Sequence, residues 1–282
     1  MDLRFYDVEH GDCCLILSQE NEAVLVDCGY NSSTRWKPSE GLAKQGFGSR
    51  RRVHHLILTH PDQDHLADLP NVIEKLKPVN VWQHPQLTMR TIADLKVTLS
   101  KAQEAYLAKK KTSAELQPIE VSKNFQTMQL RQFYLPIGSV RDVNDLSLVT
   151  FLSEERFTVC FPGDLTARGW KLHLENKAFQ YMLRETNLFV ASHHGRPTGF
   201  YEPVYEYLYP KLIVISDKEQ AKGRTVIQRA PYTKHAYGVK LEDGSFRKVL
   251  STKEDGRVRI VVKDRKWEVS TSRSEKKEEV KK

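Results

Sequence analysis

The stretch LILTHPDQDHLADL, residues 56–69, carries the strongest signal in the chain. Its apolar start is typical of a buried β-strand. Four side chains that bind cations or transfer protons then follow within six residues: His60, Asp62, Asp64 and His65. Pro61 excludes these positions from a helix interior, because proline lacks the N–H that a helix needs. Burying unpaired charge is costly, so the cluster favours a metal site over a purely structural role.

Three other apolar runs end in residues of the same chemical kind. VLVDCG carries Asp27, FPGDL carries Asp164, and FVASHHG carries His193 and His194. Residues at strand ends are held by a rigid sheet, which is where functional sites are commonly built. A dinuclear metal centre needs several imidazoles and a carboxylate that bridges the ions. Four strand ends of this type therefore predict such a centre.

The composition is that of a soluble globular protein. The chain has 282 residues, 39% of them hydrophobic, and a mean hydropathy of −0.54. It contains no apolar run of the roughly 18 residues that a membrane span needs, and its first residues form no signal core, so we expect a cytoplasmic protein without a membrane partner. The four cysteines show no C-x-x-C spacing and are expected to be buried thiols. The formal net charge of +8 favours an anionic partner such as nucleic acid.

Apolar periodicity predicts strands in hairpins first and strands alternating with helices later. Strands are expected within residues 3–18, 22–29, 53–60, 79–84, 125–135, 147–154, 156–164, 188–195, 212–217 and 257–270. Helices are expected within 66–78, 91–116, 178–186 and 200–210. Residues 30–52 read as a long loop with one helical turn. This order favours one α/β domain in which two sheets are flanked by helices.

The motif THPDQDH resembles the H-x-H-x-D-H signature of the metallo-β-lactamase superfamily, with Asp62 where the second histidine usually stands. The variant is similar to the ComEC-type metallo-hydrolase domain of competence proteins. Further segments resemble that domain in the same order: VEHGDCCLI, VLVDCG, DVNDLSLVTFL, FPGDL, ASHHGRPTG and LSTKEDGRVRIVV. The matches run from about residue 5 to 262. The resemblance implies an αββα sandwich over residues 1–270, with a helical insertion at about 86–120 and a charged tail at 271–282.

The resemblance also implies roles for individual residues. His60 and Asp62 would bind the first of two divalent ions, Mn²⁺ or Zn²⁺, and Asp64 and His65 would bind the second. Asp164 would bridge them. His193 would complete a metal site, with His194 as a further ligand or as a donor to a phosphate. Asp27 would orient a ligand histidine, and His235 would protonate the leaving group or contact a phosphate. Asp12 is expected to be structural.

Two departures from the superfamily pattern affect this interpretation. The usual histidine between the first motif and the bridging aspartate is absent, so Asn144 or Asp145 would have to serve. Exchanging an imidazole for the Asp62 carboxylate makes the donor set harder, which favours Mn²⁺ over Zn²⁺ as the working ion.

We expect a metal-dependent phosphodiesterase, most specifically a nuclease of DNA or RNA with a role in DNA processing or defence. Asp64 or Asp164 would accept a proton from the attacking water, and His194 or His235 would assist the leaving oxygen. Two alternatives stay open: a hydrolase of small esters, lactones or cyclic nucleotides, and a regulatory module with a degenerate site. The sequence carries no signal for the oligomeric state.

The sequence contains two runs of basic residues, which either face solvent or contact the phosphate backbone of a substrate. They are Arg50, Arg51 and Arg52 before the strand expected at 53–60, and Lys109, Lys110 and Lys111 within the helix expected at 91–116. If they contact phosphates, they are the substrate-binding residues of the nuclease.

Overall fold

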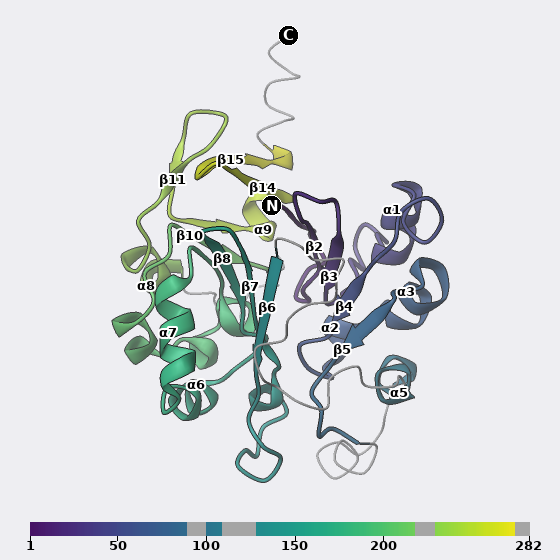
Figure 1. Ribbon diagram of the computed structural model, residues 1–282, viewed down its shortest axis with the longest axis horizontal. Coiled ribbons are helices and arrows are strands. Elements are labelled where there is room, and N and C mark those ends of the chain that lie inside the picture. Colours follow the sequence, from purple (N-terminus) through teal and green to yellow (C-terminus); the bar gives the residue numbers. More distant parts are fainter. Residues whose placement is uncertain (89–99, 109–127, 218–228, 274–282) are drawn as a thin grey trace.

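A computed structural model describes residues 1–88, 100–108, 128–217 and 229–273. Two β-sheets lie face to face, with helices on the outer face of each (Figure 1). The predicted fold class, an αββα sandwich, is therefore confirmed. None of the helices in these described ranges is long and apolar enough to cross a membrane.

The first sheet has the strand order β15-β14-β1-β2-β3-β4-β5. Its strands are β1 (Asp2–Phe5), β2 (Cys14–Leu17), β3 (Ala23–Val26), β4 (His55–Ile57), β5 (Asn80–Trp82), β14 (Val258–Lys263) and β15 (Lys266–Thr271). The three strands β3, β4 and β5 run parallel, whereas β15 to β3 pair antiparallel. Consequently β1, β3 and β4 all end at the edge of the sheet where β2 begins.

The second sheet has the order β13-β10-β9-β8-β7-β6. Its strands are β6 (Met128–Phe133), β7 (Val149–Glu154), β8 (Phe157–Phe161), β9 (Leu188–Val190), β10 (Leu212–Ile215) and β13 (Val249–Ser251). The four strands β8, β9, β10 and β13 are parallel, and β6 and β7 are antiparallel additions. A separate hairpin pairs β11 (Val239–Lys240) with β12 (Phe246–Arg247). We call the edge of the sandwich at which β3, β4, β8 and β9 end the carboxyl edge, and the opposite edge the amino edge.

Helices cover the two outer faces. Those beside the first sheet are α1 (Pro38–Lys44), α3 (Leu69–Leu76) and α5 (Lys101–Ala108), and those beside the second are α6 (Ala167–His173), α7 (Lys177–Glu185) and α8 (Arg229–Lys234) (Figure 1). Two short helices, α2 (Gln63–Leu66) and α9 (Thr252–Asp255), lie at the carboxyl edge. Three apolar clusters fill the layers: one between the sheets and one under each helical layer. This packing fixes the strand ends that carry the polar residues.

Several sequence expectations change in the structure. Residues 200–210 form no α-helix: they contain only the 3₁₀ helix η4 (Glu202–Glu206), because Pro203 and Pro210 lack helix-bonding N–H groups. Helix α6 was not anticipated. His84 and His173 are buried, and the His173 ring packs on the Phe179 ring with the centroids 4.7 Å apart. All four cysteines are buried and free, as expected.

Some expectations concern residues outside the described ranges. Of the helix expected at 91–116, the structure describes α5, which ends at Ala108. The basic run that follows it, Lys109, Lys110 and Lys111, lies outside the described residues, so its expected contacts to a phosphate backbone stay a prediction. Most of the proposed insertion at 86–120 and residues 274–282 of the tail also lie outside them.

Candidate metal centre

Four strand ends of the carboxyl edge bring polar side chains together between the two sheets. The loop after β4 and the short helix α2 supply His60 to His65, and the turn after β3 supplies Asp27. From the second sheet, Asp164 follows β8, and His193 and His194 follow β9 in the 3₁₀ helix η2 (Ser192–Gly195). The sandwich therefore places residues from distant parts of the sequence around one point.

That point is the carboxylate of Asp164, whose side chain is only 4% exposed. Its Oδ1 lies 3.3 Å from Nε2 of His65, and its Oδ2 lies 3.3 Å from Nε2 of His194. Nε2 of His60 and of His193 are 3.8 and 3.9 Å from the same Oδ2. One buried carboxylate thus faces four imidazole rings, which is the arrangement expected of a carboxylate shared between metal ions.

The tightest group of potential ligand atoms consists of Asp12, His65, Asp164 and His194. One atom from each lies within 4.8 Å of every other. Nε2 of His65 and Nε2 of His194 are 3.2 Å apart, and Oδ2 of Asp64 is 3.7 Å from the latter. Imidazole nitrogens and carboxylate oxygens at such distances can bind one divalent ion together.

A second group of potential ligand atoms lies around the His60 ring. Oδ2 of Asp62 is 4.0 Å from Nε2 of His60, and this nitrogen is buried without a hydrogen-bond partner among the described residues. A buried polar atom without a partner is costly, and a metal ion would satisfy it. His193 is held differently: Arg196 donates to its Nε2 at 3.1 Å, and its Nδ1 is 3.0 Å from Oγ1 of Thr198. Binding a metal through His193 Nε2 would require Arg196 to move.

Asp27 fixes the orientation of the His65 ring. His65 Nδ1 lies 2.7 Å from Oδ2 of Asp27, and Thr59 donates its backbone N–H and its hydroxyl to the same carboxylate at 2.8 and 2.7 Å. Because a carboxylate only accepts, Nδ1 of His65 carries a proton, which leaves Nε2 as the nitrogen that can bind a metal ion. This is how carboxylates commonly support histidine ligands of metals.

The electrostatics of the cluster are strongly coupled. Burial would raise the pKa of Asp164, but the imidazoles of His194 and His65 outweigh burial and hold it well below its usual range. Burial would lower the pKa of His65, yet the Asp164 and Asp27 carboxylates hold it well above its usual value. Burial raises the pKa of Asp12 to about 6. The donor set therefore fits divalent cations, which take the place of protons on such ligands.

Unusual backbone geometry makes the cluster possible. His193 and His194 both have left-handed conformations, with φ of 50° and 55°, so two consecutive imidazoles approach Asp164. Gly11 lies against the loop of α2: a Cβ atom there would be 1.9 Å from the carbonyl oxygen of Asp64. Only glycine permits this approach, which brings the Asp12 turn beside the histidines.

The remaining site candidates make other contacts. Asp145 accepts hydrogen bonds from the backbone N–H and hydroxyl of Thr166, at 2.9 and 3.1 Å, and so anchors the loop that follows Asp164. Its neighbour Asn144 accepts a bond from Ser147 through its backbone carbonyl. His235 lies 3.2 Å from Glu202 and stacks on Tyr205 at 4.1 Å. In the described ranges, no ion pair or ring contact joins His235 to the cluster around Asp164.

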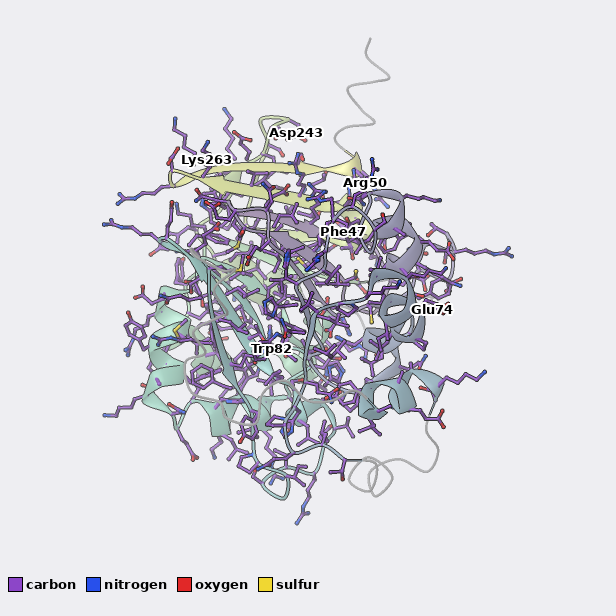
Figure 2. All side chains as sticks on the ribbon, turned by 45° about the vertical axis from the view of Figure 1, so that its right-hand side comes forward. Phe47, Arg50, Glu74, Trp82, Asp243 and Lys263 are labelled. Carbon is purple, nitrogen blue, oxygen red and sulfur yellow. The ribbon has the colours of Figure 1, made fainter. Side chains whose placement is uncertain are left out.

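The arginine run Arg50–Arg52 precedes β4 and lies at the amino edge, opposite the cluster. The guanidinium of Arg51 packs on the Phe47 ring at 4.4 Å. Figure 2 shows Phe47 and Arg50 together near α1, well apart from Trp82 at the end of β5. This position is unsuited to contacts with a group held at the carboxyl edge.

Sequence reasoning undervalued Asp12, which was expected to be structural. Asp12 belongs to the tightest ligand group, and it is only half-buried. The available signal was the pair Gly11-Asp12, which lies in the turn before β2. Because β2 is the antiparallel neighbour of β3, it begins where β3 ends, next to Asp27.

The comparisons with known proteins agree with this architecture. The family model described as the metallo-beta-lactamase superfamily matches residues 6–153. Igni18, a metallo hydrolase from the hyperthermophilic archaeon Ignicoccus hospitalis, is 12% identical over 93% of this chain and 100% of its own, with a TM-score of 0.56. A diphosphatase from the PhnP family is 10% identical over 92% of this chain and 97% of its own, with a TM-score of 0.49. No curated protein matches the chain.

Proposed function

We propose that this chain, which belongs to the metallo-β-lactamase superfamily, is a metal-dependent phosphodiesterase that cleaves DNA or RNA. The observation that carries the proposal is the convergence of four imidazoles on the buried carboxylate of Asp164. So many ligand atoms in so small a volume suit divalent ions better than a packed core. The formal net charge of +8 supports a polyanionic substrate.

Two divalent ions match the donor set. The side chains that would hold them are His60, Asp62 and His193 for the first, Asp64, His65 and His194 for the second, and Asp164 for both. Asp12 adds a carboxylate on the second side. The number of carboxylates favours Mn²⁺ over Zn²⁺. Ions bound here would activate a water molecule at neutral pH and neutralise charge on a phosphate.

The residues of the chain would supply the rest of the chemistry. Asp64 is 39% exposed at its side chain, so it can accept a proton from an attacking water and pass it to solvent. Arg196 lies next to His193, and its positive charge can pair with a phosphate oxygen once a metal ion replaces it on Nε2 of His193. If His194 binds the second ion through Nε2, this nitrogen cannot protonate the leaving oxygen, so His235 would have to do so after leaving Glu202.

Cleavage of labelled polynucleotides tests the proposal. Single- and double-stranded DNA and RNA are incubated with the protein and Mn²⁺, Mg²⁺ or Zn²⁺, and Asp64→Ala/His65→Ala serves as the inactive control. We expect cleavage of at least one polynucleotide that depends on metal and is lost in the control. Hydrolysis of bis(p-nitrophenyl) phosphate without cleavage of any polynucleotide would contradict a nuclease and point to a small phosphodiester. A metal-loaded protein inactive on every substrate would contradict the hydrolase itself.

A further inference from the structure

A cavity of about 910 Å³ lies beside α1 on the outer face of the first sheet. One wall is the segment from Asn31 to Gln45, and the other is formed by the ends of the β14–β15 hairpin. We call this cavity the α1 groove. Five basic side chains line it: Arg35, Lys37, Lys44, Arg257 and Arg273. The floor contains the stacked rings of Tyr6 and Trp36, whose centroids are 4.7 Å apart.

The α1 groove is strongly cationic. Against its five basic residues stand two acidic ones, Asp7 and Glu40, and Glu40 lies 3.7 Å from the ammonium group of Lys75 outside the groove. A second cavity, of about 690 Å³ at the amino edge, has basic and acidic side chains in equal number. A smaller third cavity of about 530 Å³ shares Arg265 and Lys211 with it and adds Lys240. Clustered cations along a hollow attract a polyanion, whereas balanced charges do not.

The α1 groove opens at the same edge as the candidate metal centre. Phe5, the last residue of β1, pairs with Val258 at the start of β14 and with Cys14 at the start of β2. Asp7 and Arg257 therefore lie at the carboxyl edge, as does Asp12. The end of the groove at Asp7 and the cluster at Asp12 thus adjoin neighbouring strands at the same edge.

We propose that the α1 groove binds the phosphodiester backbone of a single-stranded polynucleotide and leads it to the metal centre. This inference rests on the proposed function, because it names the path of the same substrate. Flexible single strands fit a hollow lined with arginine and lysine, and their binding releases counterions from each contacted phosphate. The α1 groove would make the contacts to the phosphate backbone that the sequence suggested for Arg50–Arg52, because those arginines lie at the amino edge, away from the metal centre.

A matched pair of charge reversals tests the groove. Arg35→Glu/Arg273→Glu changes one exposed arginine on each wall. The control is Arg156→Glu/Arg265→Glu at the amino edge, which makes the same change of charge at exposed arginines. Arg35 and Arg265 are matched further, since both have a left-handed backbone conformation, with φ of 58° and 62°. None of the four contacts the cluster around Asp164 in the described ranges.

Binding of a fluorescent twenty-nucleotide DNA strand is measured in EDTA over a range of salt concentrations. We expect the groove variant to bind at least tenfold more weakly than the control, with a salt slope smaller by about 1.4, because two phosphate contacts are lost. The rate of bis(p-nitrophenyl) phosphate hydrolysis with Mn²⁺ should be equal in the wild type, the groove variant and the control. Equal rates would show that the metal centre is intact in all three.

The outcomes separate the two proposals. If the wild type binds and cuts the strand but the groove variant and the control bind it equally well, the α1 groove is not the binding site. The proposed nuclease activity is then still supported. If the wild type hydrolyses bis(p-nitrophenyl) phosphate but binds no strand, both the nuclease and the groove are contradicted.

Discussion

Asp27 holds the ring of His65 at 2.7 Å, and both side chains are completely buried. The pair links the first sheet to the centre of the site, because Asp27 directly follows β3 and His65 lies in α2 after β4. Asp27 itself has a left-handed backbone, with φ of 54°. Asparagine tolerates this conformation well, so an Asp27→Asn substitution changes the chemistry and keeps the geometry.

Asp27→Asn should weaken metal binding. The amide can still accept from Thr59 through its oxygen, which turns its NH₂ group toward Nδ1 of His65 and forces the proton onto Nε2. A protonated Nε2 cannot bind a cation. We expect an affinity for Mn²⁺ about 10- to 100-fold lower by isothermal titration calorimetry, with the circular dichroism spectrum unchanged. Wild-type affinity in a folded variant would show that Asp27 has only a structural role.

Asp12 provides a second test, because the sequence alone gave it a structural role. Asp12→Asn preserves size but removes the charge next to His65 and His194. Since metal binding to acidic ligands displaces protons, the wild type should bind Mn²⁺ more tightly as the pH rises through about 6, the pKa of Asp12. The variant should lose part of this pH dependence and bind about tenfold more weakly at pH 7. An identical pH dependence in both proteins would remove Asp12 from the site.

His193 and His194 should contribute unequally to metal binding. His194 is 1% exposed and close to His65 and Asp164, whereas His193 is 12% exposed and shares its Nε2 with Arg196. We therefore expect His194→Ala to abolish binding of one ion and His193→Ala to weaken the other by a smaller factor. Titration of each variant with Mn²⁺ measures both stoichiometry and affinity. A larger loss in His193→Ala would reverse the assignment.

His173 gives a prediction for stability rather than function. Its ring is buried against Phe179, and burial lowers its pKa to about 3. The unfolded chain, with a pKa near 6.5, binds this proton first, so the folded state loses stability as the pH falls from about 6.5 toward 3. Between pH 6 and 4.5 the loss from this residue is about 2 kcal/mol.

His173→Phe should remove that part of the acid sensitivity. Urea unfolding at pH 6 and pH 4.5, followed by fluorescence, compares the two proteins in the metal-free form. Between pH 6 and pH 4.5 the free energy of unfolding should fall by about 2 kcal/mol less in the variant than in the wild type. Equal losses would mean that the His173 ring is protonated in the folded protein.

The sequence allowed most of the sandwich and the centre of the site to be predicted. An apolar run that ends in His60, Asp27, Asp164 or His193 can be identified without coordinates. Parallel strands end at one edge, so such residues are expected to meet. The packing of the two sheets then brings the ends of β3 and β4 opposite the ends of β8 and β9.

Details set by loop conformation could not be predicted. Asp12 reaches the cluster because Gly11 lies directly against the backbone of Asp64. His194 reaches it because two consecutive residues are left-handed, a conformation that is uncommon for any residue other than glycine. Asp145 carries the same chemistry as the ligand-type residues, but its oxygens are taken by Thr166.

Metal binding at Asp164 is the central feature of the proposed site. Metal-free protein is titrated with Mn²⁺ by isothermal titration calorimetry, and the bound metal is verified by mass spectrometry after desalting. Asp164→Asn is the matched variant, since it keeps the shape of a side chain that faces four imidazoles. We predict two equivalents in the wild type and loss of tight binding in the variant. No binding to the folded wild type, or equal binding by Asp164→Asn, would contradict the metal centre.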